Sequence, residues 1–173
     1  IQMVKSLGIP YKIDDRRRVL LGTNVEFQGT LRDYQENAVR AILARDFGTA
    51  TLPTGAGKTV IGLAAIARRK QPTLVVVHTS ELMHQWIERI GMFLKIPEAK
   101  IGIIGGGKRR IGYKITVGLI QSLTKCAEEI APHIGFVVVD ECHRAPSKTF
   151  TECLARFDCR YVLGLSATPW RRD

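Results

Sequence analysis

A short stretch near the start of the chain carries the residue types that bind nucleotide phosphates. Residues Leu52–Thr59 read Leu-Pro-Thr-Gly-Ala-Gly-Lys-Thr. Gly55 and Gly57 would let backbone N–H groups turn inward onto phosphate oxygens, and a helix that follows adds the positive end of its dipole. Lys58 can then reach the β- and γ-phosphates, and the hydroxyl of Thr59 can ligate Mg²⁺. The stretch predicts a loop that binds ATP with Mg²⁺.

Two adjacent carboxylates stand at the end of an apolar run further along the chain. Asp140 and Glu141 follow Phe136–Val139, and ligands of open parallel sheets bind beyond the carboxyl ends of the strands. Asp140 suits Mg²⁺ held through water, and Glu141 suits the orientation of an attacking water. Phosphoryl transfer needs little beyond such positioning and charge neutralisation. We therefore predict Thr59, Asp140 and Glu141 as the metal site, and Lys58 with the two carboxylates as the catalytic residues of an ATP hydrolase.

Strands and helices, recognised by their different hydrophobic periodicities, must position these residues. Short β-rich runs alternate with helical patterns, which predicts an α/β fold with a mostly parallel central sheet and helices on both faces. The expected strands cover residues 48–52, 73–78, 100–104, 115–119, 136–139 and 161–165. The expected helices cover residues 31–45, 57–69, 81–94 and 147–156, and Ser80 is expected to cap the third of them.

The charge of the chain is uneven. The formal net charge is +10, and residues 61–120 hold ten basic and three acidic side chains. A basic excess attracts phosphate backbones, although it also occurs on proteins that only need a soluble surface. Residues 105–110 read as a flexible basic loop that contains Lys108, Arg109 and Arg110. We take these three as candidate nucleic-acid contacts; a charge run that is merely solvated is the alternative.

Length and composition limit the class of protein. The 173 residues suit one domain, and the apolar runs are too short to span a membrane. No signal-peptide pattern opens the chain, so we expect a protein of the cytoplasm, nucleoid or nucleus rather than a secreted one. The four cysteines read as reduced thiols; a zinc site at Cys153, Cys159 and His143 would match no common ligand spacing. The chain begins at Ile1, so its start was processed or it is a piece of a longer protein.

Six segments, in order, resemble motifs of superfamily 2 helicases. They are Leu31–Gln35 (the Q-motif), Pro53–Thr59 (motif I), Val75–Trp86 (motif Ia), Ile115–Leu123 (the next nucleic-acid-facing segment), Asp140-Glu141-Cys142-His143 (motif II in its DECH form) and Ser166-Ala167-Thr168 (motif III). Motif I of this family often lacks the first glycine of the general pattern, which fits Leu52 here. Gly164–Pro169 with Arg171 and Asp173 looks most like the type III restriction, DNA-repair and phage helicase group. The resemblance covers residues 31–173 and implies a RecA-like P-loop NTPase domain.

The resemblance assigns roles to matching positions. Gln35 would read the adenine edge with help from Arg32. His143 would connect the ATP site to the nucleic-acid face, and Ser166 and Thr168 would couple hydrolysis to movement from a strand between those of motifs I and II. The nucleotide-binding residues would be Pro53, Thr54, Gly55, Ala56, Gly57, Lys58 and Thr59. The phosphate contacts on nucleic acid would be Thr79, Ser80, Gly118, Gln121 and Ser122. Trp86 follows the apolar spacing of its helix, so we expect it in the core.

The resemblance also implies partners. Motors of this family place ATP between two RecA-like domains, and the second supplies arginine fingers. Residues 31–173 would be the first motor domain, and residues 1–30 an edge segment or the tail of an upstream region. We expect this chain alone to bind ATP and to hydrolyse it slowly, with DNA favoured over RNA as the nucleic acid and no membrane partner. An RNA-directed DECH motor, a passive nucleic-acid-binding module and another P-loop enzyme such as a nucleotide kinase are the alternatives.

Overall fold

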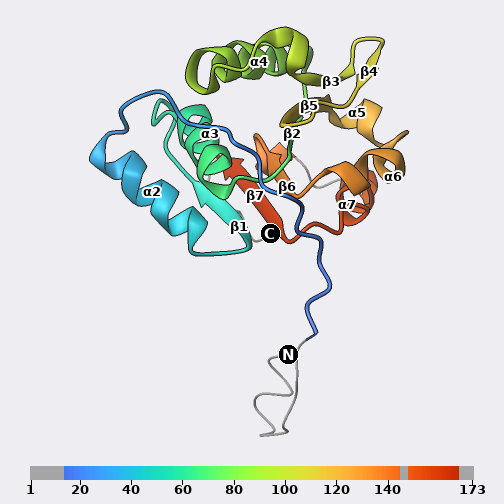
Figure 1. The fold of residues 1–173 in the computed structure, drawn as a ribbon, viewed down its shortest axis with the longest axis horizontal. Coiled ribbons are helices and arrows are strands. Elements are labelled where there is room, and N and C mark those ends of the chain that lie inside the picture. Colours follow the sequence, from blue (N-terminus) through green and yellow to red (C-terminus); the bar gives the residue numbers. More distant parts are fainter. Residues whose placement is uncertain (1–13, 145–147, 168–173) are drawn as a thin grey trace, which may run out of the picture.

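A mostly parallel sheet forms the centre of the protein. In the computed structural model, which describes residues 14–144 and 148–167, seven strands lie in the order β1-β7-β6-β2-β5-β3-β4 (Figure 1). The strands are β1 (Phe47–Thr51), β2 (Thr73–Val77), β3 (Gly102–Gly105), β4 (Lys108–Arg110), β5 (Ile115–Leu119), β6 (Phe136–Val139) and β7 (Tyr161–Ser166). Every neighbouring pair is parallel except β3 with β4. The predicted α/β class is confirmed, and most strand boundaries fall within a residue or two of the expected ones.

Helices cover both faces of the sheet (Figure 1). They are α2 (Asp33–Leu43), α3 (Lys58–Arg69), α4 (Ser80–Leu94), α5 (Ile120–Leu123), α6 (Ala127–Ile130) and α7 (Lys148–Ala155). Within β2, Val75 and Val77 pack in one hydrophobic cluster with α3 and α4, whereas Leu74 and Val76 pack in a second cluster with α5, α6 and α7. This alternation follows from the two-residue period of a strand, and a continuous apolar run is what a strand covered on both faces requires.

The cap of α4 differs from the prediction. The side chain of Thr79, rather than that of Ser80, accepts a hydrogen bond from the backbone N–H of Leu82 at 3.2 Å. Ser80 is already the first helical residue. Both residue types are good caps, so composition alone could not choose between neighbours.

The predicted flexible basic loop is a β-hairpin. Gly105 pairs with Lys108 across a two-residue turn, and both turn residues, Gly106 and Gly107, have positive φ values of 58° and 77°. This is the geometry of a type I′ turn, which glycine adopts without a steric penalty and which matches the twist of a hairpin. The expectation was wrong because the run of glycines was interpreted as flexibility rather than as a turn between short strands.

Residues 14–30 form an extended segment that lies along the domain. Arg18 makes a parallel bridge with Cys159 just before β7, and the Leu20 backbone exchanges two hydrogen bonds with the side chain of Gln71 at the end of α3. Further along, Phe27 stacks on Phe93 of α4 with ring centroids 5.6 Å apart. Residues 14–30 therefore pack along the domain through backbone, side-chain and ring contacts.

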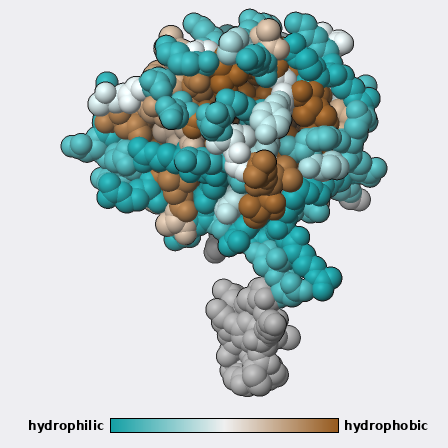
Figure 2. All heavy atoms as spheres, viewed as in Figure 1, coloured by the Kyte–Doolittle hydropathy of each residue, from teal (hydrophilic) through white to brown (hydrophobic). Residues whose placement is uncertain are grey.

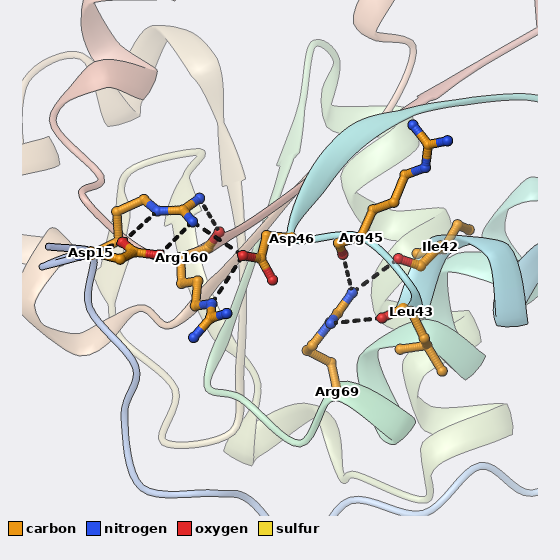
Figure 3. Close-up of polar contacts among 8 residues, drawn as sticks. Asp15, Ile42, Leu43, Arg45, Asp46, Arg69 and Arg160 are labelled. Atoms are coloured by element: carbon orange, nitrogen blue, oxygen red, sulfur yellow. Dashed lines mark hydrogen bonds and ion pairs between the residues drawn. The ribbon is translucent and has the colours of Figure 1, made fainter. Parts of the chain in front are cut away.

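Charged side chains hold this segment and the adjacent helix ends. Arg17 pairs with Asp15 and with Asp46, and Arg160 also pairs with Asp46 (Figure 3). In the same view, Arg69 of α3 donates to carbonyl oxygens at the end of α2, including that of Ile42 at 3.0 Å. A cation near a helix C-terminus satisfies carbonyls that lack an intrahelical partner. Arg17 and Arg160 thus fasten the start of the described chain to Asp46, just before β1.

The surface of the domain is mostly polar. Figure 2 shows polar side chains over much of one face, with apolar groups gathered in separate patches between them. Within residues 14–144 and 148–167, none of the helices has the length and apolar character needed to cross a bilayer.

Cys126, Cys142, Cys153 and Cys159 are free and buried, and burial raises the pKa of each thiol, that of Cys159 to about 11. Such thiols are unreactive at neutral pH.

Candidate ATP and nucleic-acid site

The candidate site lies at the carboxyl edge of three neighbouring strands. β7 lies between β1, which leads into the phosphate loop, and β6, which leads into Asp140. The backbone N–H of Leu52 donates to the carbonyl oxygen of Ser166 at 2.9 Å, so the start of the loop and the end of β7 are joined directly. The expectation that the motif III strand separates those of motifs I and II is confirmed.

The phosphate loop has the backbone geometry that its glycines suggested. Gly55 and Gly57 have φ values of 82° and 77°, in the left-handed region that favours glycine. Gly57 is the N-cap of α3, and Lys58 and Thr59 form its first turn, so the loop ends at a helix N-terminus. Backbone N–H groups and the helix dipole thus meet where an anion would bind.

Gln35 lies under the phosphate loop, where two of its polar atoms are already engaged. The side chain is 7% exposed; its Nε2 donates to the Ala56 carbonyl oxygen at 3.1 Å, and its Oε1 accepts from the Arg32 backbone N–H at 3.0 Å. A side-chain amide still has one hydrogen and one lone pair to offer an adenine edge. Close packing also explains the second loop glycine, because a Cβ on Gly57 would lie 2.7 Å from Gln35 Nε2.

Tyr34 is a site residue that the sequence analysis missed. Its hydroxyl donates to the same Ala56 carbonyl oxygen at 3.1 Å, while its side chain remains partly exposed. Its position directly before Gln35 was the available signal, but a tyrosine on a helix face reads first as a packing residue. Tyr34 and Gln35 together tie α2 to the phosphate loop.

Asp140 is buried with hydrogen bonds to both carboxylate oxygens. It is 5% exposed; Oδ2 accepts from the indole Nε1–H of Trp86 at 2.8 Å, and Oδ1 accepts from the Glu141 backbone N–H at 2.9 Å. Burial raises the pKa of this carboxyl, and the Trp86 and Glu141 hydrogen bonds and the charge of Lys58 act in the opposite direction.

Glu141, His143 and Ser166 form a connected row beside Asp140. His143 Nε2 lies 3.3 Å from Glu141 Oε2, and His143 Nδ1 lies 3.2 Å from Ser166 Oγ. Glu141 has a φ of 53°, which is uncommon for a residue with a side chain and is a form of local strain found at functional sites. The imidazole is thus a physical link between the motif II glutamate and the motif III serine.

The oxygen donors at this edge fit Mg²⁺. The ion favours hard oxygen ligands, keeps several of its waters and uses one or two carboxylates with substrate phosphates. A carboxylate offers about four lone-pair sites, and the Trp86 and Glu141 donors occupy one site on each oxygen of Asp140. Asp140 can therefore still accept a hydrogen bond from metal-bound water.

The predicted nucleic-acid residues lie in three places: at the strand ends beyond β2 and β5, inside β5 and on the hairpin. Thr79 and Ser80 are exposed where β2 ends, and Gln121 is exposed where the neighbouring strand β5 ends. Gln121 Nε2 donates to the His78 carbonyl oxygen at 3.4 Å, so the two segments meet, with Ser122 half-buried beside them. These residues form a continuous polar edge next to the ATP site.

Gly118 does not belong to that edge. It is buried inside β5, and a Cβ there would lie 2.9 Å from Leu123 Cδ2. The glycine lets α5 pack closely on its own strand. A phosphate contact of Gly118 would have to come from its backbone, and it stays a prediction.

The basic hairpin presents its three charges differently. Lys108 is exposed and adjoins the turn at the carboxyl end of β3. Arg109 forms an ion pair with Glu129 of α6, and Arg110 donates to the Ile101 carbonyl oxygen at 2.7 Å.

Thr168 of the predicted coupling set, with Pro169, Arg171 and Asp173 of the same segment, lies outside the described residues.

Comparisons with known proteins agree with this geometry. Residues 28–171 match the family described as "Type III restriction enzyme, res subunit". The chain is 42% identical over 143 residues to a DNA 3'-5' translocase XPB2 of Sulfurisphaera tokodaii, and 32% identical over 151 residues to a DNA 3'-5' helicase XPB of Kineococcus radiotolerans, in each case over 83% of this chain. The crystal structure of the UvsW helicase from bacteriophage T4 superposes with a TM-score of 0.71 at 24% identity, covering 96% of this chain and 68% of that one. The fold is thus the RecA-like fold of helicase motors.

The chain is short compared with these relatives. It spans 32% of the Sulfurisphaera tokodaii protein and 27% of the Kineococcus radiotolerans protein. The matched regions contain the phosphate loop, Asp140–Glu141 and the polar edge beyond β2 and β5.

Proposed function

The chain belongs to the type III restriction enzyme res-subunit family, and from this premise we propose that it is the ATP-binding first motor domain of an ATP-dependent helicase or translocase that acts on DNA. The observation that carries the proposal is the shared carboxyl edge of β1, β7 and β6, where a phosphate loop, Ser166 and the Asp140–Glu141 pair meet. The printed names of two relatives, a DNA translocase and a DNA helicase, favour DNA.

In the proposed reaction, the phosphate loop binds the triphosphate and Lys58 neutralises charge on the β- and γ-phosphates. Thr59 and Asp140 would hold Mg²⁺, which when bound would neutralise negative charge that develops in the transition state. Glu141 orients the attacking water and polarises it. Gln35, assisted by Arg32, reads the adenine edge from beneath the loop.

Coupling to movement is proposed to pass through His143. Its ring touches Glu141 on one side and Ser166 on the other, so a change at the γ-phosphate can alter the end of β7. Thr168 is assigned to the same coupling set. A second motor domain is proposed to supply arginine fingers, which are worth roughly 10³–10⁵ in rate. The coverage of about a third of each relative's length leaves room for such a domain.

DNA as the nucleic acid can be tested by competition. We expect unlabelled duplex DNA to displace a fluorescent duplex DNA from the protein at lower concentration than duplex RNA of the same sequence, because the two duplexes differ in groove shape and in the 2′-hydroxyl. Fluorescence anisotropy at fixed salt measures the displacement. Preferential displacement by RNA would favour the alternative of an RNA-directed motor, and equal, weak binding of both would favour a passive module.

The hairpin is proposed to contact the DNA backbone chiefly through Lys108. Replacing Lys108 by alanine is expected to reduce the slope of log binding constant against log salt by about one, because one phosphate contact is lost. Arg110→Ala serves as the control: its guanidinium bonds to the Ile101 carbonyl, so its loss should lower stability and leave the slope unchanged. A slope that stays constant after Lys108, Arg109 and Arg110 are all neutralised would remove the hairpin from the interface.

A further inference from the structure

A buried tryptophan touches the carboxylate assigned to Mg²⁺. Trp86 is 1% exposed, and its Nε1–H donates to Asp140 Oδ2 at 2.8 Å across 54 positions of sequence. The Glu141 backbone N–H fixes the other carboxylate oxygen. One of the two donors that set the orientation of Asp140 is therefore a side chain from a distant helix. Outer donors of this kind orient metal-binding carboxylates and commonly tune affinity.

The tryptophan comes from the helix whose first residues face the proposed DNA path. α4 begins at Ser80, directly after its cap Thr79, and Trp86 lies on the inward face of α4 with Met83 and Ile90. A rigid helix moves as a unit, so a shift of its exposed start also shifts the indole. Trp86 thus joins the polar edge beyond β2 to the ATP site by direct contact.

A glycine on the neighbouring helix makes room for the indole. A Cβ on Gly62, in the middle of α3, would lie 3.0 Å from Trp86 Cη2 and 3.1 Å from Leu165 Cδ1. Glycine inside a helix costs roughly 0.5–1 kcal/mol relative to alanine. A glycine at position 62 thus allows α3, α4 and β7 to approach one another closely around the indole ring. Each of these three elements adjoins one of the site motifs, so the packing of the site elements constrains the position of the ring.

We propose that Trp86 is a positioning residue that fixes the Asp140 carboxylate for Mg²⁺ and transmits displacement of α4 on DNA binding to the ATP site. The inference rests on the proposed function and adds to it a route by which nucleic acid regulates the metal site. The route consists of one helix and one hydrogen bond. It runs parallel to the Glu141–His143–Ser166 row and shares no residue with it.

The test measures Mg²⁺ binding to the full chain with bound ADP, without turnover. Trp86→Phe keeps an aromatic ring and deletes the N–H. We expect the Mg²⁺ midpoint, followed with a fluorescent ADP analogue, to rise about tenfold or more, in line with the loss of an outer-shell partner. Affinity for the same analogue in excess EDTA should stay unchanged. Ile90→Ala is the matched control, because it removes a similar number of buried atoms from the same face of α4 and makes no bond to Asp140.

Two further measurements keep the inference testable if Trp86→Phe folds poorly. Gly62→Ala retains the N–H and presses on the ring, so it should raise the Mg²⁺ midpoint in the same direction by a smaller factor. The sequence has two tryptophans, Trp86 and Trp170. In a Trp170→Phe background the emission comes from Trp86 alone, and it should change when Mg²⁺ is added to the ADP complex and again when duplex DNA is added.

The outcomes separate the two proposals. Equal Mg²⁺ midpoints for Trp86→Phe and Ile90→Ala, or a Trp86 emission that does not respond to DNA, would overturn the inference while the proposed function stands. A parent protein that shows no Mg²⁺-dependent nucleotide binding would overturn the proposed function itself. A midpoint that rises in Trp86→Phe, rises less in Gly62→Ala and stays at the parent value in Ile90→Ala, with a DNA-sensitive Trp86 emission, is the predicted result.

Discussion

Replacing Lys58 by alanine is expected to weaken Mg²⁺·ATP binding by on the order of 100-fold, or ~2.7 kcal/mol. Lys58 is the first residue of α3, directly after the left-handed Gly57, so it lies at the helix N-terminus where an anion would bind. Without it, the charge of the β- and γ-phosphates is met only by backbone dipoles and Mg²⁺. Isothermal titration calorimetry with a non-hydrolysable ATP analogue measures the loss.

The control for this variant removes the same charge elsewhere. Lys125 is exposed in the turn between α5 and α6, so Lys125→Ala should leave ATP affinity unchanged. Unchanged ATP affinity in a folded Lys58→Ala protein would refute the assignment of residues 53–59 as a phosphate loop.

Replacing Glu141 by glutamine is expected to leave ATP binding intact and to lower turnover by roughly 10²–10⁴-fold, the usual contribution of a general base. The change is nearly isosteric, so the left-handed backbone at this position and the fold around it should persist. A neutral amide can still contact His143, but it cannot accept a proton from water. Turnover is best measured with the second motor domain present, because the rate without it is expected to be low.

The matched control is Glu26→Gln, an exposed position outside all the site motifs, which should turn over ATP at the parent rate. If Glu141→Gln keeps its turnover, another residue orients the water, and the Glu141–His143–Ser166 row has only a structural role. If instead both binding and turnover are lost, the carboxylate contributes to the metal site more than to water activation.

The sequence was sufficient for the features that depend on local pattern. The apolar runs at Thr73–Val77 and Phe136–Val139 predicted buried parallel strands, and both strands lie in the middle of the sheet. The glycines of the phosphate loop predicted a tight turn before a helix, and their φ values agree. The order of the motif strands came from the family resemblance rather than from the residues themselves.

Contacts between distant positions could not be predicted. The hydrogen bond from Trp86 to Asp140 joins two residues for which the sequence made unrelated predictions. Trp86 was expected in the core, and Asp140 was expected as a metal ligand. Gly118 carried a motif match, yet its environment in β5 is set by Leu123 of the following helix. Residues 14–30 show no helical or strand periodicity. Their conformation is held by backbone hydrogen bonds to elements far along the chain, such as the bond from the Gln28 N–H to the Phe93 carbonyl oxygen.

The hairpin shows a different limit. Gly106-Gly107 is compatible with a mobile loop and with a type I′ turn, and only the pairing of Gly105 with Lys108 decides between them. The choice changes the functional expectation, since a hairpin holds Arg109 against Glu129 and Arg110 against the Ile101 carbonyl, and presents Lys108 alone near the turn. Of the three candidate nucleic-acid contacts, Lys108 thus becomes the principal candidate.

The most direct test of the central claim is steady-state ATP hydrolysis by this chain, with and without duplex DNA, alongside a measurement of ATP binding. The claim is that the chain holds the nucleotide and Mg²⁺ site of a motor whose rate depends on a second domain. It predicts Mg²⁺-dependent ATP binding with negligible turnover in both conditions. Fast, DNA-stimulated turnover would contradict it, because the charge that completes the transition state would then come from within this chain or from a second copy of it.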